Sequence, residues 1–309
     1  MDKKEPLLAR PLVVTLLAIL CNALWGSAIP FINLGYRLFG VASGETATQI
    51  FFAGCRFFVA GLLTIALTSL IQRRLVRPKA CNVHMVFKLA TLQTVTQYVF
   101  FYIGVANTTG VKGAIVQGLN AFVMILIACY VFRSEKMNSL KWIGGAVGVI
   151  GVIVMNLGGD LGGGMHLTGE GFLMASLVIN ALASGAIKIF SQKEDPVALS
   201  GWQFMLGGVI MAAIGFAMGG RLQVTGVPAL LVLAYLAGVS AVAYTVWSLL
   251  LKYNPVSRIA PFMFLRPIFG VGLSLLFDPA MEVAYLQCGV ALVLVSMSIV
   301  IIGKAQQRG

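Results

Sequence analysis

Residues 12–32 read LVVTLLAILCNALWGSAIPFI, an apolar stretch without a charged side chain. An α-helix needs about 20 predominantly apolar residues to cross the hydrocarbon core of a bilayer. The stretch therefore predicts a membrane-spanning helix. Basic residues precede it, as in a signal peptide, but it continues through Asn22, Trp25 and Pro30 without a small-x-small cleavage site. We expect it to be retained as the first helix.

Nine further apolar stretches of similar length follow, separated by short polar connections. Hydrophobic residues make up 59% of the 309 residues and charged residues only 10%, which excludes an ordinary soluble domain. The sequence therefore predicts an all-α membrane protein with ten transmembrane helices. The predicted spans are 12–32, 50–71, 85–105, 113–132, 142–157, 171–187, 201–218, 228–251, 259–277 and 283–302.

The ten spans divide into two sets of five that echo each other. Asn22-Ala-Leu-Trp-Gly-Ser-Ala-Ile29 in the first span resembles Asn180-Ala-Leu-Ala-Ser-Gly-Ala-Ile187 in the sixth. Because five crossings are an odd number, two halves of one fold must have opposite orientations, the inverted-repeat design of many secondary transporters. We expect a first five-helix repeat at 1–158, a glycine-rich connector at 159–170 and a second repeat at 171–309.

The net charge of +12 raises the question of a nucleic-acid partner, but the basic residues fall on alternate connections between spans, as in membrane proteins. The opposite connections hold only Arg37, Lys112 and Arg221. Basic loops stay in the cytoplasm, so we expect both termini to be cytoplasmic in a bacterial-type plasma membrane, and no nucleic-acid partner. The residues on the basic side are Lys3, Lys4, Arg10, Arg73, Arg74, Arg77, Lys79, Arg133, Lys136, Lys141, Lys188, Lys193, Lys252, Arg258, Lys304 and Arg308.

Chemistry based on metals, acids or cysteines is not expected. The five cysteines have no paired spacing, and His84 and His166 fall on opposite sides of the membrane, so we expect no disulfide, metal site or cofactor. All ten carboxylates lie outside the predicted spans. An intramembrane hydrolase and a buried proton relay both need such groups, so neither is expected.

Arg266 is the most informative polar residue, since it lies within two positions of the middle of the ninth span. A charged side chain at this depth costs at least about 2.5 kcal/mol on insertion scales. The guanidinium must face a water-filled cavity, be held by carbonyls and amides, or meet an anionic ligand. In the alternative, purely structural interpretation, the long side chain extends partly toward the cytoplasmic end of the helix. Pro261 and Pro267 each remove a helix hydrogen bond in the same span, which predicts a kinked helix in the binding or gating region.

Uncharged amides inside the spans either form hydrogen bonds between helices or line a polar cavity. We expect interhelical bonds from Asn22 and Asn180, which are placed symmetrically beside small residues. Gln97, Gln117 and Asn120 are expected to face a cavity.

Aromatic residues inside the spans could stack on the apolar part of a substrate. Trp25, Tyr98, Tyr244 and Trp247 are the candidates, whereas Tyr102 lies near a predicted boundary, where interfacial aromatic residues occur.

Two further basic residues lie near the ends of spans. Arg56 is expected to extend toward the outer surface and Lys88 toward the cytoplasmic surface, without a substrate role. Glycines recur inside the fifth, seventh and ninth spans, where close packing within the bundle is favoured over a dimer face, although a homodimer is left open.

Several motifs, in order along the chain, resemble the EamA-type branch of the drug/metabolite transporter superfamily. They are Trp25-Gly-Ser-Ala-Ile, Arg56-Phe57, Phe101-Tyr-Ile-Gly-Val-Ala-Asn-Thr-Thr109, Glu135 and Leu265-Arg-Pro-Ile-Phe269. The resemblance implies a ten-helix carrier with a central cavity between its halves. Members of that family mostly export amino acids and other small metabolites. This chain departs from the family pattern with Asn120 where a proline is common and Arg266 where a glutamate is frequent.

The sequence as a whole predicts a secondary transporter that moves a small organic metabolite by alternating access. Amino acids or related carboxylates, moved outward, are the favoured substrates, with membrane lipids as the surroundings. The alternatives are a carrier for organic phosphates or nucleotide-linked metabolites, a membrane-embedded lipid-modifying enzyme, and a receptor or scaffold. An enzyme is not expected, because no catalytic constellation is present.

Overall fold

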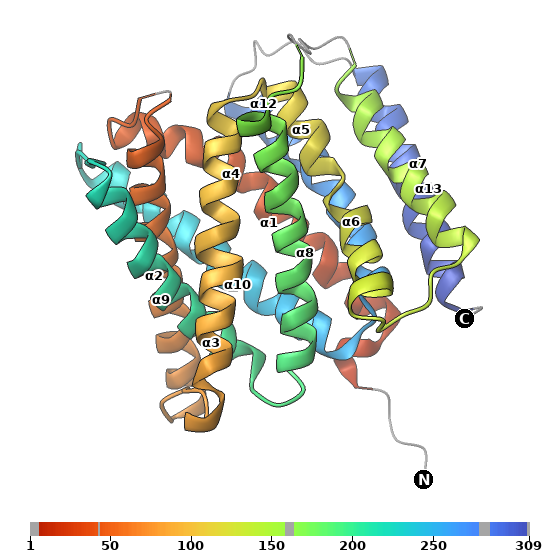
Figure 1. Ribbon diagram of the computed structural model, residues 1–309, viewed down its shortest axis with the longest axis horizontal. Helices are drawn as coiled ribbons and strands as arrows, with labels where there is room; N and C mark the ends of the chain where they lie inside the picture. The colour runs from red at the N-terminus through yellow and green to blue at the C-terminus, as the bar shows by residue number, and fades with distance from the viewer. Residues whose placement is uncertain (1–5, 43, 158–163, 278–284, 308–309) are drawn as a thin grey trace.

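The structure is a bundle of helices, and its described residues contain no strand (Figure 1). The computed structural model describes residues 6–42, 44–157, 164–277 and 285–307. Within these ranges nine helical stretches are long and apolar enough to cross a membrane, and a shorter apolar helix, Ser139–Met155, accompanies them. The prediction of an all-α membrane protein is confirmed, with the fifth predicted span falling on the shorter helix. Residues 159–163 of the predicted connector at 159–170 and both chain ends lie outside the described residues.

The α-helices are α1 (Pro11–Leu38), α2 (Thr46–Gln72), α3 (Val83–Leu89), α4 (Gln97–Ala106), α5 (Gly110–Gly118), α6 (Asn120–Leu126), α7 (Ser139–Met155), α8 (Phe172–Phe190), α9 (Pro196–Ala217), α10 (Val227–Tyr253), α11 (Val256–Ile259), α12 (Leu265–Phe277) and α13 (Tyr285–Gln307).

Three of the apolar stretches contain π-helical segments, and one of these segments, Leu167–Gly171, lies just ahead of α8. Ala90–Thr96 joins α3 to α4, and Ile127–Val131 follows α6. A further break at Leu119 separates α5 from α6. Segments of this kind are frequent at functional sites, because they redirect side chains and leave backbone groups available. The third and fourth crossings are therefore irregular in the interior of the bundle.

The ninth stretch is interrupted at its proline. A 3-10 helix, Ala260–Phe264, separates α11 from α12, and Pro261 lies at its start. Proline lacks an N–H and its ring clashes with the preceding turn, which explains the interruption. Pro267 instead falls in the first turn of α12, where a missing N–H removes no intrahelical bond. The predicted kink thus comes from the 3-10 segment around Pro261.

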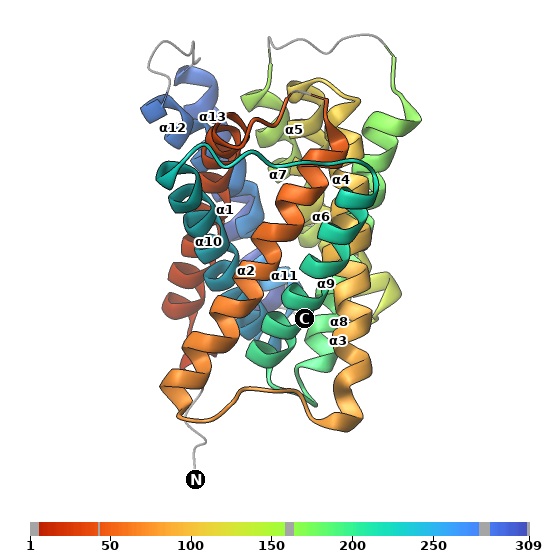
Figure 2. The ribbon, with the colours of Figure 1, turned by 90° about the vertical axis from the view of Figure 1, so that its left-hand side faces the viewer.

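Close packing of α2 against α9 depends on small residues (Figure 2). A Cβ atom on Gly54 would lie 2.3 Å from the backbone nitrogen of Ala212, and one on Gly208 would lie 2.3 Å from that of Phe58. Side chains cannot occupy such distances, so glycine on each helix allows the two backbones to touch. Helices α7 and α13 form a second closely packed pair, and α1 packs against both α10 and α12.

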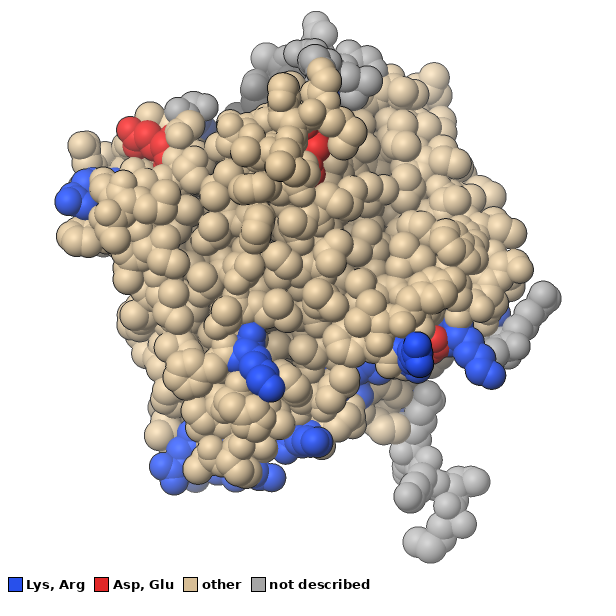
Figure 3. Space-filling model, in the orientation of Figure 1, with Lys and Arg blue, Asp and Glu red and all other residues tan. Residues whose placement is uncertain are grey.

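Charged side chains on the face shown in Figure 3 lie toward the two ends of the bundle and leave an apolar band between them. Most of the basic ones gather at the end where α1 begins. Large apolar side chains such as Leu62 of α2, Ile143 of α7 and Val293 of α13 are exposed on the outside. Such a band fits the hydrocarbon core of a bilayer, with the basic end at one membrane surface.

Candidate functional site

A cavity of about 490 Å³ lies inside the bundle. Side chains from α1, α2, α4, α5, α6, α8, α10 and α12 line it, so residues from all along the chain converge there. Its size falls within the range of small-molecule sites. A larger surface hollow, about 1060 Å³, is lined at the basic end by residues that lie mainly on loops, including Arg77, Lys79 and Lys193. The interior cavity is the better candidate site, because it combines enclosure with buried polar groups.

Arg266, the second residue of α12, lines this cavity. Its guanidinium carbon lies 4.5 Å from the centroid of the Trp25 ring, a cation–π contact that offsets part of the cost of a charge at this depth. The buried Nε of Arg266 has no hydrogen-bond partner. Among the described residues no carboxylate forms an ion pair with Arg266. A cation is therefore available in the cavity.

Aromatic rings pack around Trp25. The rings of Trp25 and Tyr244 are edge to face, with centroids 5.1 Å apart, and the hydroxyls of Tyr98 and Tyr244 lie 2.5 Å apart. Trp25, Tyr98 and Tyr244 all line the cavity. Trp247 is not among the lining residues: it is buried, with its ring centroid 5.2 Å from that of Trp25. The expectation that Trp247 faces a substrate is corrected, because it packs behind Trp25.

The three amides predicted to face a cavity, Gln97, Gln117 and Asn120, line this one. Asn120 opens α6 immediately after the break at Leu119. The buried atoms Gln97 Oε1, Gln117 Nε2 and Asn120 Oδ1 have no partner. An unpaired buried polar atom is costly, so water or ligand groups are needed to satisfy these amides.

Asn22 and Asn180 were expected to form hydrogen bonds between helices, but the bonds that the structure gives them lie within their own helices. Asn22 Nδ2 donates to the carbonyl oxygen of Ala18, one turn earlier in the same helix, at 2.8 Å. Asn180 lines the cavity, and its Oδ1 accepts from the hydroxyl of Ser184 at 3.5 Å, again within one helix. Both amides thus bond within their own helix, and the buried Oδ1 of Asn22 has no partner.

The position of Arg56 differs from the one expected from the sequence. Arg56 does not extend to the outer surface: it is only 3% exposed, and it lines the cavity. Its Nε and Nη2 both donate to the hydroxyl of Ser240, at 3.1 and 2.9 Å. Tyr102, expected at the membrane interface, is likewise buried and lines the cavity. The Arg56-Phe57 motif was visible in the sequence, but nothing there showed which way the arginine points. Lys88, by contrast, is exposed as expected.

At the end opposite the basic loops, the cavity reaches Thr108 and Thr109, between α4 and α5. The hydroxyl of Thr108 donates to Glu170 Oε1 at 2.7 Å, and Lys112 Nζ lies 3.6 Å from the same oxygen. Glu170 was expected outside the spans, but it is buried in the first turn of the helical stretch Leu167–Phe190. The Lys112–Glu170 ion pair therefore lies beside this end of the cavity.

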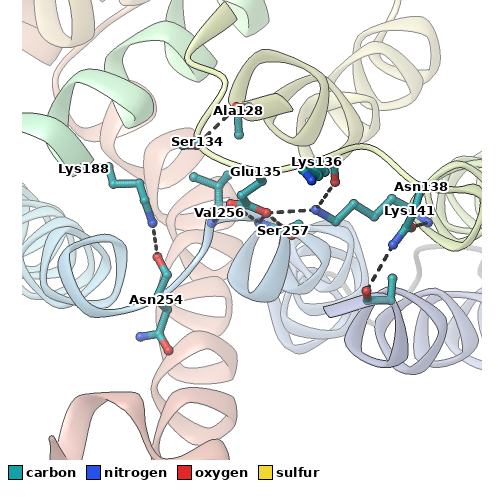
Figure 4. Close-up of polar contacts among 11 residues, drawn as sticks. Ala128, Ser134, Glu135, Lys136, Asn138, Lys141, Lys188, Asn254, Val256 and Ser257 are labelled. Carbon is teal, nitrogen blue, oxygen red and sulfur yellow. Dashed lines mark hydrogen bonds and ion pairs between the residues drawn. The ribbon is translucent and has the colours of Figure 1, made fainter. Parts of the chain in front are cut away.

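Polar contacts link the elements at the basic end (Figure 4). Glu135, after the fourth crossing, accepts hydrogen bonds from the backbone N–H groups of Val256 and Ser257 and from the Ser257 hydroxyl. Lys141 Nζ lies 3.1 Å from Glu135 Oε2. The carboxylate thus caps the start of α11 and ties it to α7.

A second bond at this end joins α8 to the end of α10. Lys188 Nζ donates to the carbonyl oxygen of Asn254 at 2.5 Å (Figure 4). The Asn254 amide in turn donates to the carbonyl oxygen of Leu8, ahead of α1. These contacts join α8, the end of α10 and the segment ahead of α1 at the basic end.

Metal chemistry finds no support in the described part of the chain, where no group of three or more His, Cys, Asp or Glu side chains could hold a metal ion. The site is instead a cavity with a cation, aromatic rings and unpaired amides, which is suited to binding an organic anion.

Comparisons with known proteins identify a family and a fold. The EamA-like transporter family profile matches residues 12–157 and again residues 167–302. A WAT1-related chloroplastic protein of Arabidopsis thaliana is 24% identical over 253 residues, which cover 78% of this chain and 60% of that protein. A protein of Escherichia coli K12 named "Probable amino-acid metabolite efflux pump" is 23% identical over 278 residues, 85% of this chain and 86% of that one.

One crystal structure superimposes with a TM-score of 0.77 over 97% of this chain and 99% of its own, at 15% identity, which shows a shared fold. The two family matches together include the helices that line the cavity. The names of the family and of these relatives indicate a transporter rather than an enzyme. The chain belongs to the EamA-like transporter family.

Proposed function

We propose that this protein is an alternating-access carrier for a small organic anion, with amino acids or related carboxylates as its substrates. The observation that carries the proposal is Arg266 in the cavity, stacked on Trp25 and without an ion-pair partner among the described residues. A guanidinium can form two parallel hydrogen bonds to a carboxylate, so it suits this ligand better than a point charge does. The surrounding rings provide an apolar surface for the body of the substrate.

Amino acids also carry an ammonium group, which needs hydrogen-bond acceptors. The unpaired oxygens Gln97 Oε1 and Asn120 Oδ1 border the same cavity as Arg266 and can serve this purpose. A zwitterion would then place its carboxylate on Arg266 and its ammonium on the amides. This arrangement supports amino acids over simple monocarboxylates.

The proposed architecture is a ten-helix inverted repeat. Two observations support it: the family profile matches the chain twice, and helix contacts come in related pairs. α2 packs on α9 and α7 on α13, and the contact of α1 with α10 has its counterpart in that of α8 with α4. α7 would be the fifth crossing, since its 17 residues extend about 26 Å at 1.5 Å per residue, close to the bilayer core.

The two ends of the bundle support alternating access. Thr108 and Thr109 border the cavity at one end, and the contacts of Glu135 and Lys188 join helices at the basic end. In the proposed cycle the halves rock about the cavity, so the basic-end contacts break when the other end closes. The positive-inside rule assigns the basic end and both termini to the cytoplasm of a bacterial-type plasma membrane. The efflux pump named among the relatives supports export.

Counterflow in proteoliposomes tests the proposal. Vesicles containing the purified protein are loaded with an unlabelled amino acid and diluted into the same labelled compound. We expect transient accumulation of label for some amino acids, with none in protein-free vesicles. Absence of counterflow across the common amino acids and short carboxylates would refute the proposed substrate class.

Organic phosphates are the second candidate, since a guanidinium binds phosphate as well as carboxylate. Arg56 favours this candidate by adding a second cation to the cavity lining. Labelled glycerol 3-phosphate in the same vesicles separates the two substrate classes.

A further inference from the structure

Two guanidinium groups, Arg56 and Arg266, line the same cavity. The described ion pairs of the protein join Lys112 to Glu170 and Lys141 to Glu135, and involve neither arginine. Nor does any carboxylate of the described residues line the cavity. Within the described residues, two positive charges therefore face one cavity without a carboxylate to balance them.

Arg56 is held in a fixed position. The Ser240 hydroxyl accepts from two of its nitrogens, and its guanidinium carbon lies 5.2 Å from the Phe57 ring centroid. Ser240 in turn donates to the carbonyl oxygen of Leu236 in its own helix. A long side chain loses much rotamer freedom in such a site. This positioning distinguishes Arg56 from a cation that extends into solvent.

A continuous series of aromatic contacts runs between the two arginines. Arg266 stacks on Trp25, which packs against Tyr244. Tyr244 shares a hydrogen bond with Tyr98, whose ring centroid lies 4.5 Å from that of Phe57, the ring beneath Arg56. One series of aromatic contacts thus connects the two cations along the lining of the cavity.

Charge complementarity indicates what such a site binds. Two unpaired cations in a low-dielectric interior repel each other and are costly to bury, so a ligand with one negative charge would leave one of them unbalanced. A ligand with two separated negative charges satisfies both. The two guanidinium groups are held by different side chains, Arg56 by Ser240 and Phe57 and Arg266 by Trp25, so each can take one of the two charges.

We propose that the site selects organic molecules with two carboxylates on a short carbon chain, acidic amino acids among them, and that Arg56 determines this selectivity. The inference rests on the proposed function: Arg266 takes one carboxylate, as in any amino acid, and Arg56 takes the second. An acidic amino acid would also place its ammonium near the unpaired oxygens of Gln97 and Asn120.

Two matched ligand pairs test the proposal with the full-length protein in proteoliposomes. L-Glutamate and L-glutamine have nearly the same shape and differ by one carboxylate, as do succinate and succinamate. In at least one pair we expect the compound with two carboxylates to inhibit uptake of label at a concentration about tenfold lower, or less, than its monoamide does. This is the effect of one charged hydrogen bond. Equal competition within both pairs would overturn the proposal.

Variants at Arg56 test whether this residue causes the preference for two carboxylates. Arg56→Gln should reduce the apparent affinity for the dicarboxylate by about tenfold or more and the affinity for the monoamide by much less, so that the preference within each pair disappears. Arg56→Lys should keep part of the preference, because the charge remains without the forked geometry. The matched control is Arg37→Gln, an exposed arginine in the last turn of α1, which should change nothing. A preference that survives in Arg56→Gln would refute the role of Arg56.

The outcomes separate this inference from the proposed function. If neutral amino acids exchange and the acidic ones bind no more tightly, the carrier function stands and the proposed selectivity for two carboxylates fails. Stronger competition by glycerol 3-phosphate than by either dicarboxylate would also overturn it, in favour of a single doubly charged group. If Arg56→Gln does not fold, as judged by size-exclusion chromatography, the ligand pairs on the native protein and on Arg56→Lys still decide.

Discussion

The hydroxyl oxygens of Tyr98 and Tyr244 lie 2.5 Å apart, so one hydrogen bond joins α4 in the first family match to α10 in the second. It lies at the wall of the cavity, where the two halves of the chain meet. The interaction is buried and would have to adjust if the halves rock against each other.

Tyr98→Phe should therefore destabilise the protein, because it leaves the Tyr244 hydroxyl without this partner. The expected loss in the free energy of unfolding is about 0.5–1.5 kcal/mol, the net value of a typical hydrogen bond. Thermal unfolding in detergent measures it. Tyr130→Phe, at a side chain that is 57% exposed, is the matched control and should have no effect. Equal stability of the two variants would contradict this prediction.

Arg266→Ala should abolish or strongly reduce transport of carboxylate substrates while the protein remains folded in detergent. One charged hydrogen bond is worth about 1.5–3 kcal/mol, so the affinity should fall by about one to two powers of ten. Arg266→Lys should restore transport only in part, because an ammonium cannot form the two-pronged contact. Counterflow and substrate-induced thermal shifts provide the two measurements. Normal affinity in Arg266→Ala would show that the residue has a structural role only.

Glu135→Gln should loosen the basic end of the bundle. The substitution removes the charge that pairs with Lys141, a side chain only 4% exposed, and weakens the cap on α11. Breaking a buried ion pair by changing one partner typically costs about 3–5 kcal/mol. Cys129, nearby and buried, should then react faster with a maleimide in a Cys81→Ser background, as followed by mass spectrometry. Glu45→Gln, at an exposed carboxylate on the other end of the bundle, is the control. Unchanged labelling of Cys129 in Glu135→Gln would contradict the proposed closure at the basic end.

The charge asymmetry predicts that Cys81, exposed in the basic connection between α2 and α3, faces the cytoplasm. A membrane-impermeant thiol reagent should label it in inside-out vesicles and not in intact cells. Labelling from outside intact cells would reverse the proposed orientation.

Transport should not require a proton gradient. The described residues that line the cavity include no carboxylate and no histidine, the groups on which proton relays in carriers usually depend. We expect facilitated diffusion or exchange at the same rate with and without a pH gradient across the liposome membrane. Substrate accumulation driven by an imposed pH gradient would contradict this expectation.

The positions of the helical stretches along the chain were predictable. The order of apolar and basic segments predicted where these stretches lie and that Arg266 falls within one of them. The structure places Arg266 in an interior cavity, together with Gln97, Gln117 and Asn120. Long apolar runs give a strong signal, because a bilayer tolerates few alternatives to a helix.

Only the tertiary structure decided which face of each helix turns inward. Arg56 and Tyr102 line the cavity, although their positions near predicted boundaries favoured the surface, and Trp247 packs behind Trp25 rather than beside the ligand space. In a soluble helix, one polar face reveals the orientation. Helices in a membrane are apolar toward both lipid and protein, so hydropathy determines their depth and carries little information about their rotation. The rotation depends on contacts with neighbouring helices, such as Gly54 against Ala212, which form only when segments distant in the sequence are packed together.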